Sequence, residues 1–567
     1  MDRSKLIQEF DEHVNNKNIG SLNGSLYESL CKEIALACFQ SSLNEEGVFF
    51  LSESHAASLR LECVYQENFQ SLLNSAKNPS SKIGLDMEYV SFHSSFMGEK
   101  YQGLMARLKE MPKEWTVVQM TRSFNERSRW IKRKPNSEPT SAEFHIVNYS
   151  CGDSRVPCHV MLPKPDKTLC GSDIIEDIYN ISVKNWVSIG KLSATNNKIK
   201  RMENCAKLKL LVNLITQRWL KEWSCLLLGK FLDTQVENFI RCAIDDVLSE
   251  SSTQLNSCNK VLLYQIASGC AHLDQSEIKS AVSYVIEDGT LQENLCERIK
   301  SIKDKYTDLI RLKRHPVILI LDEDIEGIPW EMTTVLRIHP VCRIPSIHFL
   351  HALYKKHEKN ILNGNVIISD PNNAYFIINP EQNLTSTEKR ITTFIKKRSP
   401  KWRGLTGTKP EKNEFADALT KYDLFLYCGH GNGSQFFKSS DIVGLNVKAI
   451  PFLMGCSSFQ YKNLGGRVGS YCLCLKYIIA GSPCMLGTLW PITSTDTDNI
   501  TITLLNHWLP GKPADLKTIE GFSEEFVLPD QSFYEPELLR ILKTSRDVSL
   551  LYSNKASLVV YGLPVKI

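Results

Sequence analysis

The sequence predicts an α/β protein, built on a parallel-rich sheet that helices flank and preceded by regions that are largely helical. Short apolar runs recur after residue 314, and polar or amphipathic segments long enough for crossover helices separate them. Continuous apolar runs that alternate with helical segments are typical of strands buried on both faces. The runs are PVILILD (316–322), NAYFIINP (373–380), DLFLYCGH (423–430), AIPFLMGC (449–456) and PCMLGTLW (483–490).

The chain divides into three predicted regions. Residues 1–80 are expected to form a short helical N-terminal region, because their apolar residues recur at helical spacing. Residues 85–315 begin with β-like alternation, as in EWTVVQMTR (114–122), and continue as a long helical insertion over about 168–313. Residues 316–567 carry the apolar runs and therefore the predicted sheet.

The sequence predicts two helices with specific features, one in the insertion and one in the C-terminal region. The segment 205–232 is the longest helix candidate in the insertion. The segment 384–398 offers a capping box, in which Thr385 would cap the helix and Glu388 would reach back to it.

Composition and charge exclude several function classes. The 567 residues carry 67 basic and 63 acidic side chains, a net charge of +4 that does not call for direct nucleic-acid binding. The N-terminus lacks the apolar core of a secretory signal. The most apolar stretch, 471–492, is interrupted by Lys476, Gly481 and Pro483, so no membrane span is expected. Eighteen cysteines without a signal peptide indicate a reducing compartment.

Two of the apolar runs end on residues whose side chains carry chemistry. The run at 423–430 ends on His430, which glycines flank, and the run at 449–456 ends on Cys456. Catalytic groups of parallel sheets gather at the carboxyl ends of the strands. If these two strands are neighbours, the imidazole and the thiol meet. His430 would then be the base for Cys456, and the N–H groups of Gly431 and Cys456 would bind the oxyanion.

Structural interpretations of the same residues stay open at this point. A cysteine that ends an apolar run is usually a packing residue, and a histidine between glycines is more often a turn residue than a base. Catalysis and packing therefore have about equal weight on these residues alone. Cys472 and Cys474 would face apart on a helix, and Cys151 and Cys158 lack a second Cys/His pair at a zinc spacing, so no metal and no cofactor is expected.

An ordered series of short motifs runs through residues 316–567. In chain order it comprises LDEDIEGIPWE (321–331), CRIPSIHFL (342–350), INPEQNLTSTE (378–388), WRGLTG (402–407), YCGHGNG (427–433), LMGCSS (453–458), AGSPCMLGTLW (480–490), TDTDNIT (495–501) and YGLPVKI (561–567). This series resembles the catalytic domain of the separase family, caspase-like cysteine endopeptidases that open cohesin at anaphase. More weakly, MPKEWTVVQMTR (111–122) is similar to the inactive protease-like domain of that family, which carries a helical insertion.

The resemblance implies roles for individual residues. It makes His430 the base and Cys456 the nucleophile of a caspase-type dyad that cleaves after arginine, typically in Glu-x-x-Arg. An arginine-selective pocket needs a buried carboxylate. Asp498 stands at the matching position, with Asp496 a second candidate and Trp490 a wall of the pocket. Capping of the helix that follows is the competing interpretation for Asp496 and Asp498, and it is strong for Asp496.

The chain also departs from the family pattern. The acidic residue that usually follows the tryptophan is Pro491 here, and Ser494 replaces another acidic residue. Asp498 is therefore expected to carry more of the charge of the pocket.

The resemblance further implies partners and a place in the cell. The substrate would be the kleisin subunit of cohesin, and a securin-like inhibitor would occupy the site as a pseudosubstrate. Only about 80 residues precede the inactive domain, so a separate helical scaffold subunit is expected to replace the long superhelix of other members. Localisation would be cytoplasmic, with access to the nucleus and chromosomes in mitosis. The alternatives are a non-catalytic protease-like scaffold and another caspase-like thiol hydrolase.

Overall fold

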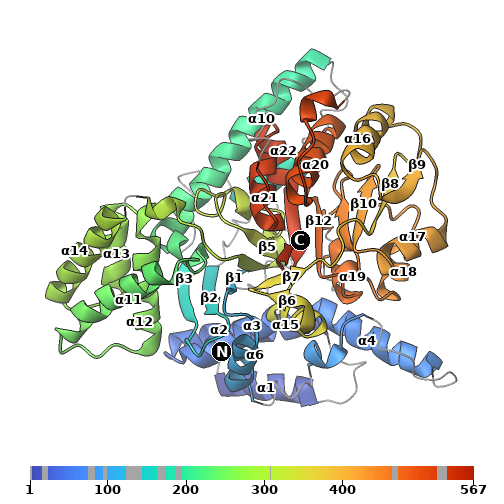
Figure 1. The fold of residues 1–567 in the computed structure, drawn as a ribbon. Helices are drawn as coiled ribbons and strands as arrows, with labels where there is room; N and C mark the ends of the chain where they lie inside the picture. The colour runs from blue at the N-terminus through green and yellow to red at the C-terminus, as the bar shows by residue number, and fades with distance from the viewer. Residues whose placement is uncertain are drawn as a thin grey trace.

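A sheet of eleven strands runs through the centre of the described part of the chain, and helices cover it (Figure 1). The structure is a computed structural model. It describes residues 3–15, 23–74, 84–92, 99–122, 144–162, 174–184, 194–306, 308–462, 470–519 and 533–567. In the view of Figure 1 the N-terminal helices lie beneath the sheet, and the helices of residues 234–305 form a group to its left.

The strands of this sheet lie in the order β3-β2-β1-β4-β5-β13-β12-β11-β10-β8-β9. They are β1 (Thr116–Arg122), β2 (Phe144–Ser150), β3 (Cys158–Leu162), β4 (Val317–Leu321), β5 (Val341–Arg343), β8 (Ala374–Ile378), β9 (Arg403–Thr406), β10 (Leu424–Cys428), β11 (Ile450–Leu453), β12 (Cys484–Thr488) and β13 (Leu558–Gly562). Neighbours pair in parallel except β1 with β2, β2 with β3, and β12 with β13. The predicted class, a parallel-rich sheet flanked by helices, is confirmed.

A smaller sheet joins β14 (Val565–Lys566), β7 (Asn365–Ile367) and β6 (Ile361–Leu362). All five apolar runs of the sequence form strands of the large sheet, namely β4, β8, β10, β11 and β12. Every residue of β4, β10 and β12 is buried, as expected of strands with helices on both faces.

The helices fall into three groups along the chain. The first comprises α1 (Arg3–Asn15), α2 (Gly24–Gln40), α3 (Asn44–Ser54), α4 (Ala57–Asn74) and α6 (Tyr101–Glu110). The insertion holds α8 (Ile174–Tyr179), α10 (Ala194–Leu214), α11 (Thr234–Ser249), α12 (Ser257–Gly269), α13 (Gln275–Val285) and α14 (Gly289–Lys305). Around the C-terminal strands lie α15 (Ile347–His357), α16 (Thr385–Arg398), α17 (Lys412–Thr420), α18 (Ser439–Val443), α19 (Leu473–Ile479), α20 (Ser494–Trp508), α21 (Leu538–Arg546) and α22 (Tyr552–Ser557). Among the helices of the described ranges, none is long and apolar enough to cross a membrane.

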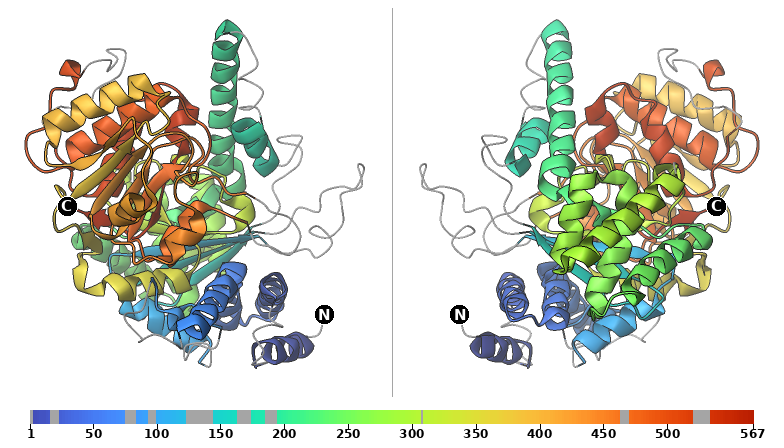
Figure 2. Two further views of the ribbon diagram at one scale, coloured as in Figure 1. Left: turned by 90° about the vertical axis from the view of Figure 1, so that its right-hand side faces the viewer. Right: turned by 90° about the vertical axis from the view of Figure 1, so that its left-hand side faces the viewer.

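The long helix of the insertion differs from the prediction. The α-helical part is α10, which begins earlier than residue 205 and ends at Leu214. A π-helical turn and a 3₁₀ turn follow, and they meet at Lys221, whose φ of 44° is incompatible with a continuous α-helix. In both views of Figure 2, α10 projects away from the body of the molecule.

The capping box predicted for α16 is wrong. Thr385 is the first residue of this helix, and Leu384 precedes it without offering a side-chain cap. The N–H of Leu384 instead donates to Oδ1 of Asn379 over 2.8 Å. Asn379 follows β8 and has a φ of 51°, a conformation that asparagine tolerates better than most residues. The start of α16 is therefore held by the side chain of Asn379 and not by the predicted pair of Thr385 and Glu388.

The predicted domain boundary at residue 316 falls within one continuous sheet. Strand β1, from the region 85–315, pairs in parallel with β4, from Thr116 opposite Val317 to Met120 opposite Leu321. The junction predicted at residues 75–84 lies, except for its last residue, outside the described residues. The division of the chain into domains stays a prediction.

Candidate active site

The loops after four neighbouring parallel strands meet at one edge of the sheet. These strands are β12, β11, β10 and β8, in that order. Strand β10 pairs with β11 from Leu424 opposite Ile450 to Tyr427 opposite Leu453, so the chain leaves both strands at the same end. His430 follows β10, and Cys456 follows β11. The expectation that these two strands are neighbours is confirmed.

The loops that carry the two residues touch backbone to backbone at Gly455. A Cβ atom added to Gly455 would lie 1.9 Å from the carbonyl oxygen of Gly431 and 2.6 Å from that of Gly429. Real Cβ atoms essentially never come this close to another atom. Only glycine fits here, and its absent side chain lets the residue before Cys456 rest on the residues that flank His430.

The loop of His430 is held from two directions. The carbonyl oxygen of His430 accepts hydrogen bonds from the hydroxyl of Tyr427 over 2.9 Å and from Nε2 of Gln435 over 3.1 Å. Nε2 of the exposed imidazole lies 3.0 Å from Oδ1 of Asn383, in the loop that follows β8. An amide oxygen can only accept, so Nε2 carries the proton and Nδ1 keeps its lone pair. This tautomer leaves Nδ1 to act as a base.

The thiol of Cys456 is exposed to solvent. Its Sγ donates to the carbonyl oxygen of Ile492, which follows β12, over 3.2 Å. Among the cysteines in the described part, Cys456 and Cys242 alone are exposed. The next residue, Ser457, has a φ of 57°, which a non-glycine residue adopts only in a tight turn. In this structure the side chains of His430 and Cys456 bond to different groups, so their direct contact stays a prediction.

Two backbone N–H groups at this edge are free. In the described part of the chain, neither Gly431 nor Cys456 donates its N–H to any acceptor. Gly431 has a φ of 61°, and a Cβ on it would meet nothing within 4 Å, so open space adjoins it. Both donors are available to a substrate oxygen, as an oxyanion hole requires. Their catalytic role stays a prediction.

The structure places Asp498 in a buried ion pair. It lies in the second turn of α20, is 3% exposed, and accepts two hydrogen bonds from Arg390 of α16 on the same oxygen. Nε of Arg390 lies 3.0 Å and Nη2 2.5 Å from Oδ2, and neither bond uses Oδ1. Burial raises the pKa of Asp498 to about 6, although Arg390 opposes the shift. Asp498, the carboxylate expected to bind a substrate arginine, is thus paired with Arg390 of the same chain.

The other two candidates for the arginine pocket have structural partners. Asp496 lies in the first turn of α20, where its carboxylate accepts from Ser549 over 2.7 Å and from the hydroxyl of Thr493, the N-cap residue. The N-cap of α20 is Thr493, and Asp496 bonds to it from the first turn; a role of Asp496 in an arginine pocket stays a prediction. Trp490 is 1% exposed, and its Nε1 donates to the carbonyl oxygen of Ser553 over 3.1 Å. A pocket wall at Trp490 stays a prediction, and this burial does not support it.

The sequence analysis did not identify Asn383 and Arg390 as site residues, although both lie in or just after the motif INPEQNLTSTE (378–388). Asn383 belongs to INPEQNLTSTE, directly after a predicted strand, and the strand-end argument applied to His430 and Cys456 would have placed it at the same edge. Arg390 carried no such signal. It lies 108 residues from Asp498 in the chain, and only the packing of α16 against α20 brings the two together.

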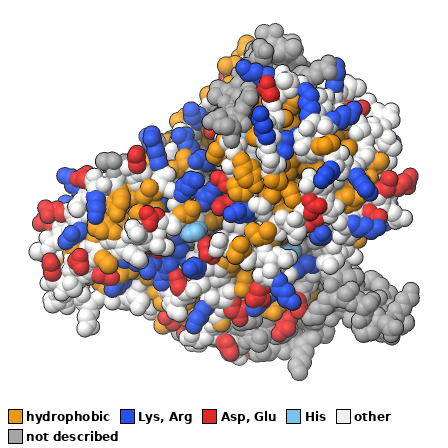
Figure 3. Space-filling model, viewed as in Figure 1, with side chains coloured by type: hydrophobic (Ala, Val, Ile, Leu, Met, Phe, Trp, Pro, Cys, Tyr) orange, Lys and Arg blue, Asp and Glu red, His pale blue; other side chains and the backbone are white. Residues whose placement is uncertain are grey.

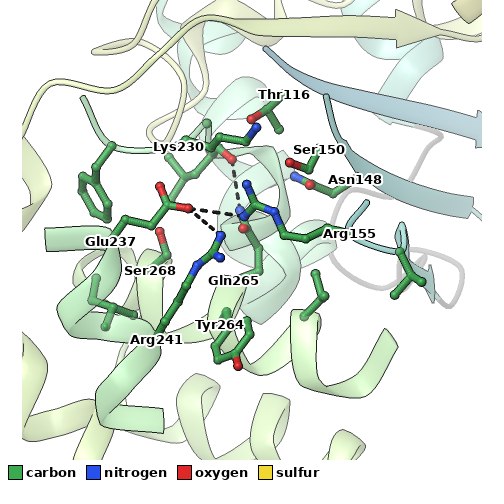
Figure 4. A pocket seen from close by; sticks show the side chains of 16 residues that line it. Thr116, Asn148, Ser150, Arg155, Lys230, Glu237, Arg241, Tyr264, Gln265 and Ser268 are labelled. Atoms are coloured by element: carbon green, nitrogen blue, oxygen red, sulfur yellow. Dashed lines mark hydrogen bonds and ion pairs between the residues drawn. The ribbon is translucent and has the colours of Figure 1, made fainter. Parts of the chain in front are cut away.

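A small cavity lies apart from His430 and Cys456 and contains neither of them in its lining. It measures about 40 Å³ and lies between β2 and the helices α11 and α12 (Figure 4). Arg155 and Arg241 both converge on the carboxylate of Glu237, over 3.3 Å and 2.8 Å. These three charged side chains are paired with one another, so they do not form a second reactive site like that of His430 and Cys456.

The contact at Gly455 makes a testable prediction. Gly455→Ala should separate the two loops, lowering the free energy of unfolding by about 1–3 kcal/mol and slowing the labelling of Cys456 by electrophiles. Gly289→Ala is the matched control, because a Cβ there meets nothing within 4 Å. Urea denaturation and the rate of labelling of Cys456 provide the two measurements. A Gly455→Ala variant as stable and as reactive as the Gly289→Ala control would show that the contact is not needed.

Comparisons with known proteins identify the family of the chain. Residues 174–498 match the family model described as "Separin, protease domain". The chain is 31% identical over 289 residues to Separin of Mus musculus and 31% identical over 273 residues to Separin of Emericella nidulans, and these matches cover 48% and 47% of the chain. They span only 13% and 12% of the relatives' own lengths.

A solved structure shows the same fold over the whole chain. It is the separase–securin complex of Saccharomyces cerevisiae, with a TM-score of 0.71 and 18% identity, covering 100% of this chain and 37% of the yeast one. The family model matches more than half of the chain and includes His430, Cys456 and Asp498. The chain therefore belongs to the family of Separin protease domains.

Proposed function

We propose that this chain is a cysteine endopeptidase that cleaves after arginine in Glu-x-x-Arg contexts. Its substrate is the kleisin subunit of cohesin, and its cleavage releases sister chromatids at anaphase. The observation that carries the proposal is the contact at Gly455, which holds the loop of an exposed thiol against the loop of a histidine with a free Nδ1. Membership of the Separin family supports the choice of substrate.

The mechanism follows from the groups at the sheet edge. His430 takes the proton of the Cys456 thiol on Nδ1, while Asn383 holds the imidazole through Nε2. Sγ attacks the carbonyl carbon after arginine, and the N–H groups of Gly431 and Cys456 bind the oxygen as it becomes negative. The imidazolium returns its proton to the leaving amine, which departs and leaves a thioester on Cys456. Water, deprotonated by His430, then hydrolyses this acyl-enzyme and frees the thiol.

Selectivity for arginine is assigned to Asp498 acting with Arg390. Both hydrogen bonds of Arg390 fall on Oδ2, and Thr387 is a further polar neighbour of the carboxylate. Oδ1 would accept from a substrate guanidinium. Arg390 would thus be a positioning residue that keeps the buried carboxylate charged and oriented. A carboxylate shared between two guanidinium groups binds each of them through charge-assisted hydrogen bonds.

Two alternatives belong to other classes of function. A non-catalytic scaffold would have no use for an exposed thiol, two unpaired N–H groups and a histidine oriented by an asparagine, all at one edge. Another caspase-like thiol hydrolase would share this machinery and differ in its specificity pocket. The first experiment below separates these alternatives from the proposed endopeptidase.

Partners and localisation follow from the same proposal. A securin-like inhibitor would bind across the site as a pseudosubstrate, and the yeast structure that the chain resembles is a complex with securin. A helical scaffold subunit would associate with the chain. Activity on cohesin requires access from the cytoplasm to the nucleus and chromosomes in mitosis.

An arginine-directed electrophilic peptide should label the chain covalently at Cys456. Peptide mapping by mass spectrometry identifies the modified residue, and Cys456→Ser should abolish the label. Cys242→Ser is the matched control, because Cys242 is the other exposed cysteine among those described. Absence of labelling in an inhibitor-free preparation would favour the scaffold. Equal labelling by peptides without arginine would favour a general thiol hydrolase.

The raised pKa of Asp498 predicts that arginine selectivity depends on pH. Below about pH 6 its carboxyl is increasingly protonated and loses its attraction for a guanidinium. The ratio of kcat/KM for an arginine peptide to that for the citrulline analogue should therefore fall as the pH drops through about 6. In Asp498→Asn the ratio should be low and independent of pH. A wild-type ratio that does not change with pH would exclude Asp498 from the pocket.

A further inference from the structure

A second, larger cavity lies where the helical insertion meets the last helices of the chain. It measures about 520 Å³, and its walls come from α10, α21, α22 and the segment that follows the 3₁₀ turn Trp330–Met332. We call it the α10 groove. Helix α10 packs against α22 along one side of it, and both lie together at the top of Figure 1. None of its lining residues belongs to the site of His430 and Cys456.

The α10 groove carries an excess of positive charge. Among the described residues that line it, Asp547 is the one carboxylate, and it pairs with Lys555 over 3.3 Å. The basic residues of the lining are Lys209, Arg337, Lys543, Arg546 and Lys555. The pKa of Lys543 is lowered, first by burial and then by the neighbouring cations Arg540 and Arg337, while Asp547 opposes the shift. The cations repel one another here, and a bound anion would relieve that repulsion.

One of these cations is buried with a hydrogen-bond donor to spare. Arg546 is 8% exposed, and its Nη2 donates to the carbonyl oxygen of Leu558 over 2.7 Å. Its Nε is buried and finds no acceptor in the described part of the structure. Burial lowers the pKa of Arg546, and the neighbouring carboxylates Glu331 and Asp547 oppose the shift. Because Nε is buried, Arg546 would attract a ligand carboxylate through its charge in the wall of the groove.

Large apolar side chains are exposed beside these charges. Leu550 is 63% and Met202 58% exposed in the groove itself. Along α10 the exposed stripe continues with Ile199 and Leu210, and the spacing of 199, 202 and 210 places all three on one helix face. Figure 3 shows hydrophobic and basic side chains intermixed over α21 and α22.

We propose that the α10 groove binds an acidic segment of a partner polypeptide in which carboxylates alternate with large apolar side chains. A carboxylate would meet the cluster of Arg337, Lys543 and Arg546, and apolar side chains would cover Leu550 and the exposed stripe of α10. A small inorganic anion would satisfy the cations but leave the apolar stripe in water. A nucleic acid would match the charge but likewise leave that stripe uncovered.

Fluorescence anisotropy with synthetic peptides tests this proposal. The probe is a labelled peptide of interspersed glutamate, leucine and phenylalanine, without arginine, so that it cannot serve as a substrate for the proposed protease. Replacing its glutamates by glutamine, or its leucines and phenylalanines by serine, should weaken binding to the full chain by about tenfold or more. The double variant Arg337→Glu/Lys543→Glu should weaken binding of the original peptide to a similar extent.

The control has the same change in charge at another place. In Lys300→Glu/Lys359→Glu two exposed lysines outside the groove are reversed, and this variant should bind the peptide almost like the wild type. Leu550→Ser disrupts the apolar part of the groove without changing its charge, and circular dichroism confirms that each variant is folded. Equal binding by the groove variants and the control would overturn the proposal. So would tighter binding of a short DNA duplex than of the acidic peptide, which would make the groove a nucleic-acid surface.

Discussion

The close approach of Gly455 to the carbonyl oxygens of Gly429 and Gly431 is the constraint on which the candidate site depends. Parallel pairing of β10 with β11 brings the two loops to the same edge, but pairing alone leaves their distance open. Because Gly455 has no side chain, its backbone can approach the carbonyl oxygens of Gly429 and Gly431. The loops of Cys456 and His430 are therefore positioned by main-chain contact, and the two side chains bond to Ile492 and Asn383 instead of to each other.

The order of the strands also sets the order of the functional groups. Along β12, β11, β10 and β8 the loops supply the carbonyl of Ile492, the thiol of Cys456, the imidazole of His430 and the amide of Asn383. The outer two groups hold the inner two in the resting state. Between α16 and α20, Asp498 and Arg390 form a buried pair in which burial and ion pairing act in opposite directions on the carboxyl pKa.

Much of this arrangement could be predicted from the sequence, because buried parallel strands are continuous apolar runs and their ends are marked by polar or glycine residues. The five runs, the adjacency of the strands before His430 and Cys456, and the flanking helices are all of this kind. Short strands such as β5, with three residues, carry no such signal. The Arg390–Asp498 pair depends on how α16 and α20 pack. The start of α16 depends on Asn379, which accepts the N–H of Leu384, five residues further along the chain. Local patterns contain neither kind of information.

The central claim is that His430 acts on Cys456 once the thiol leaves the carbonyl of Ile492. The most direct measurement is the rate of alkylation of Cys456 by iodoacetamide at neutral pH, followed on the peptide that contains it, in the wild type and in His430→Ala. Cys242 in the same sample provides the internal reference. The account predicts that the loss of His430 slows alkylation of Cys456 by about tenfold or more and leaves Cys242 unchanged. Equal rates at Cys456 in the two proteins would contradict it.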